Sequence, residues 1–100
     1  MSAVYKITAK LWIYPGGTAQ WHFLTVPKKE SETLKKKHSV HARGWGSLPI
    51  TVTIGKTKWD TSIFPDSKSG TYILPLKAAV RKAEGLFEGD SVSFSFFIRL

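Results

Sequence analysis

SVSFSFFIRL, residues 91–100, carries the clearest structural pattern in the chain. Apolar residues recur at every second position, so that one face holds Val92, Phe94, Phe96, Ile98 and Leu100. The other face holds three serines, Phe97 and Arg99. A period of two over ten residues is typical of a β-strand with one buried and one exposed face. The segment therefore predicts a strand whose inner face forms part of the core.

Working back from this segment, we expect five further strands, over residues 4–14, 19–26, 50–54, 58–64 and 71–74. Glycine and proline turns separate them, at Pro15-Gly16-Gly17, Gly55-Lys56, residues 65–70 and Gly89-Asp90. Nearly every strand has one apolar and one polar face. This favours a closed or partly closed antiparallel barrel over a parallel sheet.

Two short helices complete the prediction. Residues 28–38 form a polar segment in which Leu34 is the one strong apolar residue. Pro75 precedes a second helix, over residues 76–84, in which helical spacing predicts a common buried side for Leu76, Ala79, Val80 and Ala83. Gly85 is expected to end this helix in the left-handed conformation. The predicted fold is mainly β, a six-stranded, partly closed barrel with two short capping helices.

Length and composition limit the class of protein. One hundred residues correspond to one domain, over residues 1–100, and 42% apolar with 22% charged residues is ordinary for a globular chain. The absence of cysteine excludes disulfides, thiolate metal sites and thiol catalysis, and favours the cytoplasm. Because no segment resembles a signal peptide or a transmembrane helix, we expect no membrane association. The net charge of +8 favours nucleic acid or another polyanion as the partner.

A set of motifs resembles a known prokaryotic family. They are Gly44-Trp45-Gly46-Ser47-Leu48-Pro49, Ile54-Gly55, Trp59, Thr61-Ser62, residues 72–77, Arg81, Gly85 and Gly89-Asp90. Together they are similar to the small domain catalogued as domain of unknown function 1905, over nearly the whole chain. The resemblance implies a six-stranded double-split barrel capped by helices. It implies no activity, because none is established for that family.

The C-terminal half has a second resemblance, over residues 73–83 and 85–92. It is similar to the half-barrel unit of swapped-hairpin DNA-binding regulators of the AbrB and MazE type, which build their barrel from two chains. A faint internal echo, strand-proline-helix-strand, occurs after residues 23–27 and again after residues 72–75. We therefore expect one chain to supply both halves here. This likeness supports nucleic-acid binding modestly.

No catalytic, cofactor or metal site is predicted. His38 and His41 form an HxxH pair, but no cysteine or carboxylate motif completes a zinc site. Asp60 and Thr61 point to opposite faces of a strand, and no histidine is placed to activate Ser62. The glycines do not form a phosphate-binding GxxxxGK loop. The sequence favours a non-enzymatic protein without settling the question.

Basic side chains beside aromatic rings are the best candidates for a binding site, since such pairs suit a polyanion or a stacked base. The candidates are Arg43, Trp45, Lys56, Trp59, Lys77, Arg81 and Lys82. The leading hypothesis is a binding module for nucleic acid. The alternatives are a small-ligand or enzymatic barrel, with a pocket near Arg43, Trp45, Trp59 and Thr61 at the Gly44–Ser47 loop, and an accessory domain for protein interaction. We expect a monomer or a weak homodimer, with no cofactor.

Overall fold

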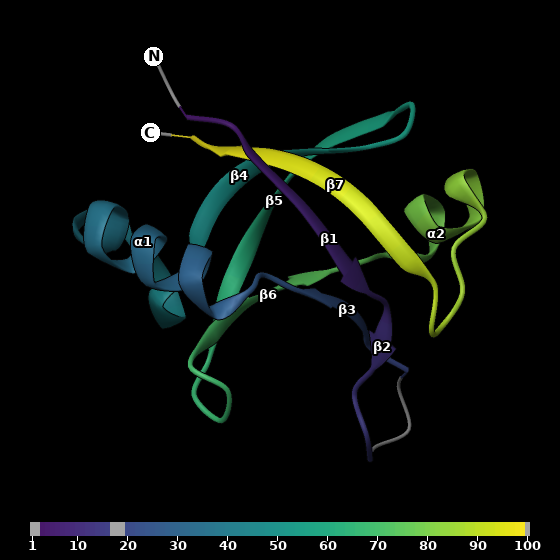
Figure 1. The fold of residues 1–100 in the computed structure, drawn as a ribbon, viewed down its shortest axis with the longest axis horizontal. Coiled ribbons are helices and arrows are strands. Elements are labelled where there is room, and N and C mark those ends of the chain that lie inside the picture. The colour runs from purple at the N-terminus through teal and green to yellow at the C-terminus, as the bar shows by residue number, and fades with distance from the viewer. Residues whose placement is uncertain (1–2, 17–19, 100) are drawn as a thin grey trace.

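A computed structural model of the chain describes residues 3–16 and 20–99 (Figure 1). Over these residues it has seven strands, two α-helices and two short 3₁₀ turns. In chain order they are β1 (Tyr5–Lys10), β2 (Trp12–Ile13), β3 (His22–Thr25), α1 (Lys28–His38), η1 (Ser39–His41), η2 (Gly44–Gly46), β4 (Leu48–Ile54), β5 (Thr57–Asp66), β6 (Thr71–Pro75), α2 (Ala78–Glu84) and β7 (Ser91–Ile98). Gly17, Ala19 and Leu100, which the sequence assigned to a turn and to strands, lie outside the described residues.

The seven strands form one antiparallel sheet in the order β1-β7-β4-β5-β6-β3-β2. The strands at its two ends, β1 and β2, are consecutive in the chain and joined by Leu11 alone. The sheet therefore curls round into a nearly closed barrel (Figure 1). The expected class, a mainly β barrel with two helices, is confirmed.

The expected count of six strands is wrong, because the predicted strand over residues 4–14 divides at Leu11. The Leu11 N–H donates to the Asp90 carbonyl (2.9 Å), and the Leu11 carbonyl accepts from the Gly89 N–H (2.8 Å). At this residue the chain passes from pairing with β7 to pairing with β3. The sequence pattern hides the change, since the Leu11 side chain stays on the buried face.

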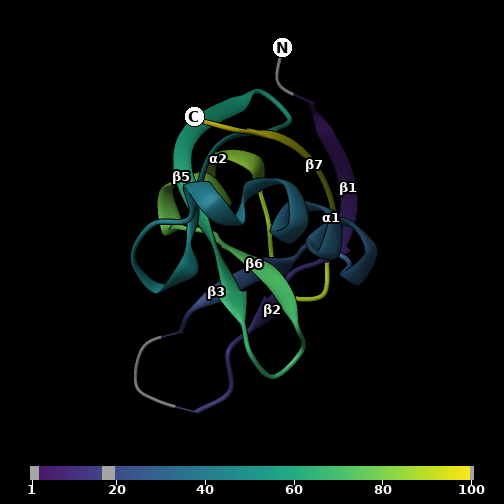
Figure 2. The same cartoon turned by 90° about the vertical axis from the view of Figure 1, so that its left-hand side faces the viewer.

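The barrel is built from two similar halves. The first part of β5 pairs with β4 and its last part with β6. In the same way, β1 pairs with β7 and the following β2 with β3. The connections β3-α1-β4 and β6-α2-β7 then repeat strand, helix, strand, as the internal echo suggested. The two helices lie on opposite sides of the barrel, with α1 in front of it and α2 behind it in Figure 2.

Apolar side chains from all strands except β2 fill the barrel. The inner face predicted for β7 is confirmed over the described residues, since its members are nearly inaccessible: Val92, Phe94, Phe96 and Ile98. Phe96 is 1% exposed and stacks on Tyr5, with their ring centroids 5.2 Å apart. The helices add Leu34 and Val80 to this core.

The expected loop from Pro65 onward is wrong in its start, because β5 continues through Pro65 to Asp66. Pro65 stands opposite Tyr72 of β6. The Tyr72 carbonyl accepts from the Val26 N–H, and the Tyr72 N–H donates to Ser31. The backbone N–H and carbonyl of Tyr72 therefore both bond to partners outside β5. Tyr72 needs no N–H donor from residue 65, so a proline is tolerated there.

The buried side predicted for the second helix is partly wrong. Leu76 and Val80 are buried, but Ala79 and Ala83 are exposed. The helix begins at Ala78, two residues later than the prediction. It turns the side with Val80 and Arg81 toward the barrel, and alanine gains little by burial compared with these longer side chains.

Ser31 joins α1 to the barrel by two hydrogen bonds in a buried position. Its hydroxyl donates to the Val26 carbonyl (2.9 Å) and accepts from the Tyr72 N–H (3.0 Å). The side chain is 2% exposed, so water cannot replace either bond.

We expect Ser31→Ala to lower the free energy of unfolding by about 1–3 kcal/mol, because it leaves the buried Tyr72 N–H without an acceptor. Urea unfolding followed by tryptophan fluorescence measures the change. Thr33→Ala on the same helix is the matched control. Its hydroxyl bonds to the Lys29 carbonyl in an exposed position, so we expect a change within about 0.5 kcal/mol. Equal losses in the two variants would contradict this role for Ser31.

Candidate functional site

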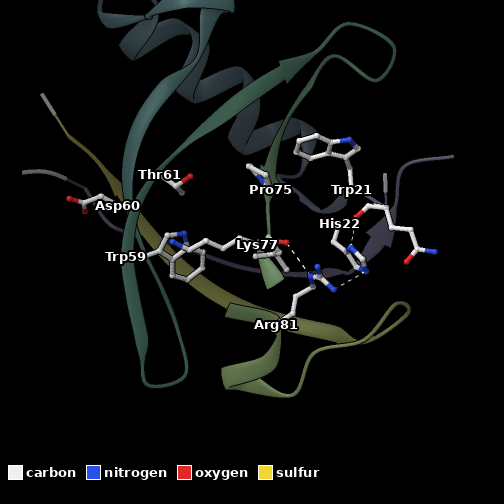
Figure 3. A pocket seen from close by; sticks show the side chains of 10 residues that line it. Trp21, His22, Trp59, Asp60, Thr61, Pro75, Lys77 and Arg81 are labelled. Atoms are coloured by element: carbon white, nitrogen blue, oxygen red, sulfur yellow. Dashed lines mark hydrogen bonds between the residues drawn. The ribbon is translucent and has the colours of Figure 1, made fainter. Parts of the chain in front are cut away.

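A cavity lies where β5 and β6 separate. The described pairing of the two strands joins Phe64–Asp66 of β5 to Thr71–Ile73 of β6. Beyond Ile73, β6 pairs with β3 instead. Toward Trp59 the diverging segments border an open space of about 340 Å³, called here the Trp59 cavity (Figure 3). Its lining includes Trp21, His22, Trp59, Thr61, Lys77 and Arg81. Three of the seven residues singled out from the sequence, Trp59, Lys77 and Arg81, are therefore brought together.

Arg81 is held in place by two hydrogen bonds. Its Nε donates to the Leu76 carbonyl (3.2 Å), and its Nη1 lies 3.3 Å from Nε2 of His22 (Figure 3). Within residues 3–16 and 20–99, Nη2 of Arg81 makes no hydrogen bond. The guanidinium is thus oriented by the fold while one of its donors stays available, which is an arrangement suited to an anion.

The hydrogen bonds of His22 show which atom donates in its contact with Arg81. Its Nδ1 lies 3.0 Å from the Gln20 carbonyl, which can only accept, so Nδ1 carries the proton. In the neutral ring Nε2 is then an acceptor for Arg81. His22 is 9% exposed, and its role in this arrangement is to position the guanidinium.

Asp60 is the one carboxylate among the described lining residues, and it is engaged elsewhere. Its Oδ1 accepts from the Thr51 hydroxyl (2.7 Å), and its Oδ2 lies 3.9 Å from Nη1 of Arg99. Figure 3 shows its side chain pointing away from Lys77 and Arg81. Among the described residues that line the cavity, no carboxylate pairs with Lys77 or Arg81, so the cavity favours a negatively charged group.

Two indole rings form walls of the cavity. Trp59 is half-buried and packs against the core, whereas Trp21 is 58% exposed. In Figure 3 they stand on opposite sides of the cavity, with Pro75 between them. Rings in such positions offer flat apolar faces to a planar group.

A second cavity, of about 680 Å³, adjoins the first at Arg81. Its lining includes Ile13, His22, Arg81, Lys82, Leu86 and Phe87. Phe87, which is 73% exposed, gives this Phe87 cavity its name. Because Arg81 and His22 line both cavities, they form a common wall between them. Lys82, predicted as a site residue, belongs to this second cavity.

The helix that carries Arg81 and Lys82 is fixed at its C-terminal end. Gly85 has the expected left-handed conformation (φ 63°), and the Leu86 N–H donates to the Arg81 carbonyl (2.9 Å). Glu84 accepts a hydrogen bond from the Thr57 hydroxyl at the start of β5 (2.6 Å). Both cavities therefore have a defined wall on α2.

The remaining candidates lie elsewhere, and the structure does not bring Arg43 and Trp45 together with Trp59 and Thr61 in one cavity. Of these four residues, only Trp59 and Thr61 line the Trp59 cavity. The Gly44–Ser47 loop, called here the Trp45 loop, packs through Gly46 against Pro65. Pro65 lies six residues further along β5 than Trp59. Six residues of strand span roughly 20 Å, which separates the two tryptophans. Arg43 is exposed beside the Trp45 loop, and Lys56 is exposed in the β4–β5 turn.

Trp45 has an unusual conformation of its own. It is 93% exposed and has a left-handed backbone (φ 65°, ψ 15°), which is costly for a residue with a side chain. Hydrogen bonds around it, including Arg43 N–H to Ser47 carbonyl (2.8 Å), hold the loop closed. Trp45 lines a third cavity, of about 720 Å³, between α1 and the β5–β6 turn.

The HxxH pair lies at the end of α1. The rings of His38 and His41 are 6.3 Å apart. Burial lowers the pKa of His38 below its ordinary value, with smaller contributions from the charges of His41 and Lys37.

Among residues 3–16 and 20–99, no group of three or more His, Cys, Asp or Glu side chains is placed to hold a metal ion. No helix in the described part of the chain has the length and apolar character needed to cross a membrane.

Trp21, His22 and Phe87 are the site residues that sequence reasoning missed. Trp21 and His22 stand at the start of a predicted strand, and Phe87 follows the glycine that ends a helix. None of them adjoins a lysine or arginine in the sequence, and a basic residue near an aromatic ring is the pattern that indicates a binding site here. The exposure of a large ring next to a strand or helix end is informative only once the fold is known.

One comparison with known proteins identifies a family for this chain. No curated protein matches the sequence. A family model described as Domain of unknown function (DUF1905) matches residues 8–96. This match includes both halves of the barrel, both helices and the residues named above as lining the Trp59 and Phe87 cavities. The resemblance noted in the sequence is therefore confirmed, and the chain belongs to the family of domain of unknown function 1905.

Proposed function

We propose that this domain is a non-enzymatic binding module for nucleic acid, with the Trp59 cavity as its binding site. The observation that carries the proposal is the meeting of Lys77 and Arg81 with two tryptophan walls in one cavity whose lining carboxylate points away. Guanidinium and ammonium groups bind phosphate, and indole faces stack on bases. The net charge of +8 supports the same class of partner by attracting polyanions over longer distances.

The proposal includes no catalytic step. Thr61 supplies a hydroxyl to the cavity, but both ring nitrogens of His22 are engaged, with Gln20 and Arg81. A hydroxyl without a free base beside it is a poor nucleophile. We further propose that the protein acts in the prokaryotic cytoplasm, as a monomer or weak homodimer. The absence of cysteine supports that compartment.

The charge reversal Lys77→Glu/Lys82→Glu tests the proposal. We expect at least a tenfold loss of affinity for labelled mixed-sequence DNA, because two cations at the cavities become repulsive. Fluorescence anisotropy at about 50 and 150 mM salt measures the affinity, which should fall linearly with salt on logarithmic axes for the parent protein. Both lysines are exposed, so the fold should be retained.

Lys36→Glu/Lys37→Glu on α1 is the matched control, since it has the same net charge as the test variant. We expect it to weaken binding less, because its charges lie away from the cavities. Equal losses in the two variants would mean that net charge alone drives binding and that the site is wrong. Lack of binding by the parent protein at the lower salt concentration would refute the proposed function.

A second candidate is a small-ligand site at the third cavity, of about 720 Å³, which Trp45 lines and which is called here the Trp45 cavity. The exposed indole on a left-handed backbone favours it, because strained residues often persist where function requires them. A metabolite panel read by tryptophan fluorescence tests it. A ligand that changes the fluorescence of the parent but not of Trp45→Phe would support this second site over the first.

A further inference from the structure

Arg81 lies where two cavities meet, and each cavity has aromatic side chains in its lining. On one side lie Trp59 and Trp21 with Lys77, and on the other lies Phe87 with Lys82. Arg81 lines both cavities, and hydrogen bonds to the Leu76 carbonyl and to His22 hold its guanidinium in place. From one cavity to the other, the order of groups is therefore aromatic, cation, aromatic.

The backbone of a nucleic-acid strand has the matching order, since each phosphate separates two bases. Base faces stack on indole and phenyl rings, and a guanidinium pairs with phosphate oxygens. Nη2 of Arg81, which bonds to no residue in the described part of the chain, is the donor that a phosphate between the cavities would meet. Lys77 and Lys82, one in each cavity lining, can neutralise the neighbouring phosphates.

We infer that the site binds single-stranded nucleic acid, with one base in each cavity and the intervening phosphate on Arg81. The inference rests on the proposed function and narrows it to one class of nucleic acid and to a minimum length of two nucleotides.

A double helix does not fit this arrangement. Its bases are covered on both faces by stacked neighbours, so they reach an aromatic wall only when unstacked. The Trp59 cavity is a concave space of about 340 Å³ set between diverging strands, and a duplex could offer it only phosphates. A single strand should therefore bind more tightly than a duplex of the same sequence.

The experiment uses thymidine nucleotides of increasing length, from the mononucleotide through the dinucleotide to a labelled twenty-nucleotide strand and its duplex. Affinities come from fluorescence anisotropy, with the short forms as competitors. We expect at least a fivefold gain from mononucleotide to dinucleotide, as the second cavity becomes occupied. We also expect the single strand to bind at least tenfold more tightly than its duplex.

Phe87→Ala tests the second base position. We expect a loss of roughly fivefold to a hundredfold for the dinucleotide and longer strands, which is the usual effect of removing one stacking ring. The loss should be smaller for the mononucleotide, because that ligand can use the Trp59 cavity alone. Phe87 is 73% exposed, so its removal leaves the core intact.

Phe64→Ala is the matched control, since it also removes a partly exposed ring (37%) that lies outside both cavities. We expect no change in single-strand affinity. Duplex and single strand bound equally tightly, with both weakened by Lys77→Glu/Lys82→Glu, would overturn this inference and leave the proposed function standing. Absence of binding to either form would overturn both.

Discussion

Phe96→Ala is expected to lower the free energy of unfolding by about 3–5 kcal/mol, which is the usual cost of emptying a buried aromatic site. Phe96 is 1% exposed and pairs in register with Tyr5 of β1 on one side and Val52 of β4 on the other. Its ring stacks on Tyr5 and lies 6.1 Å from that of Phe94. Because the barrel walls are fixed by hydrogen bonds across β7, they cannot collapse far to fill the space.

Urea unfolding measured by tryptophan fluorescence gives the change. A domain of this size is stable by about 5–15 kcal/mol, so the alanine variant could lose most of its stability. Phe96→Leu keeps more of the volume and should cost less, which keeps the test informative if the alanine variant does not fold.

Phe87→Ala provides the comparison within the same residue type. Phe87 is 73% exposed, so we expect a change in unfolding free energy within about 0.5 kcal/mol. Similar losses at positions 87 and 96 would contradict the placement of Phe96 at the centre of the core.

The strands of the barrel could be predicted because burial on one face leaves a period of two in the sequence. In β7 this pattern is complete, and its described inner residues are all buried. The division of the first strand at Leu11 left no such trace. It arises because the residue bonds to the Gly89-Asp90 turn, more than seventy residues away in the sequence, and its side chain does not change face. Alternation reports which face is buried and not which strand lies alongside.

The candidate site could be predicted only in part, for the same reason. Trp59, Lys77 and Arg81 were selected by residue type, but their meeting depends on the divergence of β5 from β6, a tertiary feature. The sequence analysis places Trp45 and Trp59 at one pocket, but most of β5 lies between Trp59 and the Pro65 position that Gly46 contacts. Trp21 enters the site through the pairing of β3 with β6, which no local pattern encodes.

Arg81→Leu is expected to reduce single-strand affinity by roughly tenfold to a hundredfold, because charge-assisted hydrogen bonds are worth about 1.5–3 kcal/mol. Removing one phosphate contact should also lower the slope of log affinity against log salt by about one. The measurement is the anisotropy titration at several salt concentrations. Lys36→Leu, which removes one positive charge from α1, is the control, and we expect it to change affinity by less than about threefold.

The same substitution should affect the fold through different partners. Leucine cannot donate to the Leu76 carbonyl or to Nε2 of His22, so two partly buried acceptors lose their bonds. We expect a loss of about 1–3 kcal/mol in unfolding free energy, measured by urea unfolding. If the variant lost stability but kept its affinity and salt dependence, Arg81 would serve only to anchor α2 to β3. If both fell, the bonds that anchor the helix would also be those that orient the guanidinium for its ligand, and stability and binding would share one residue.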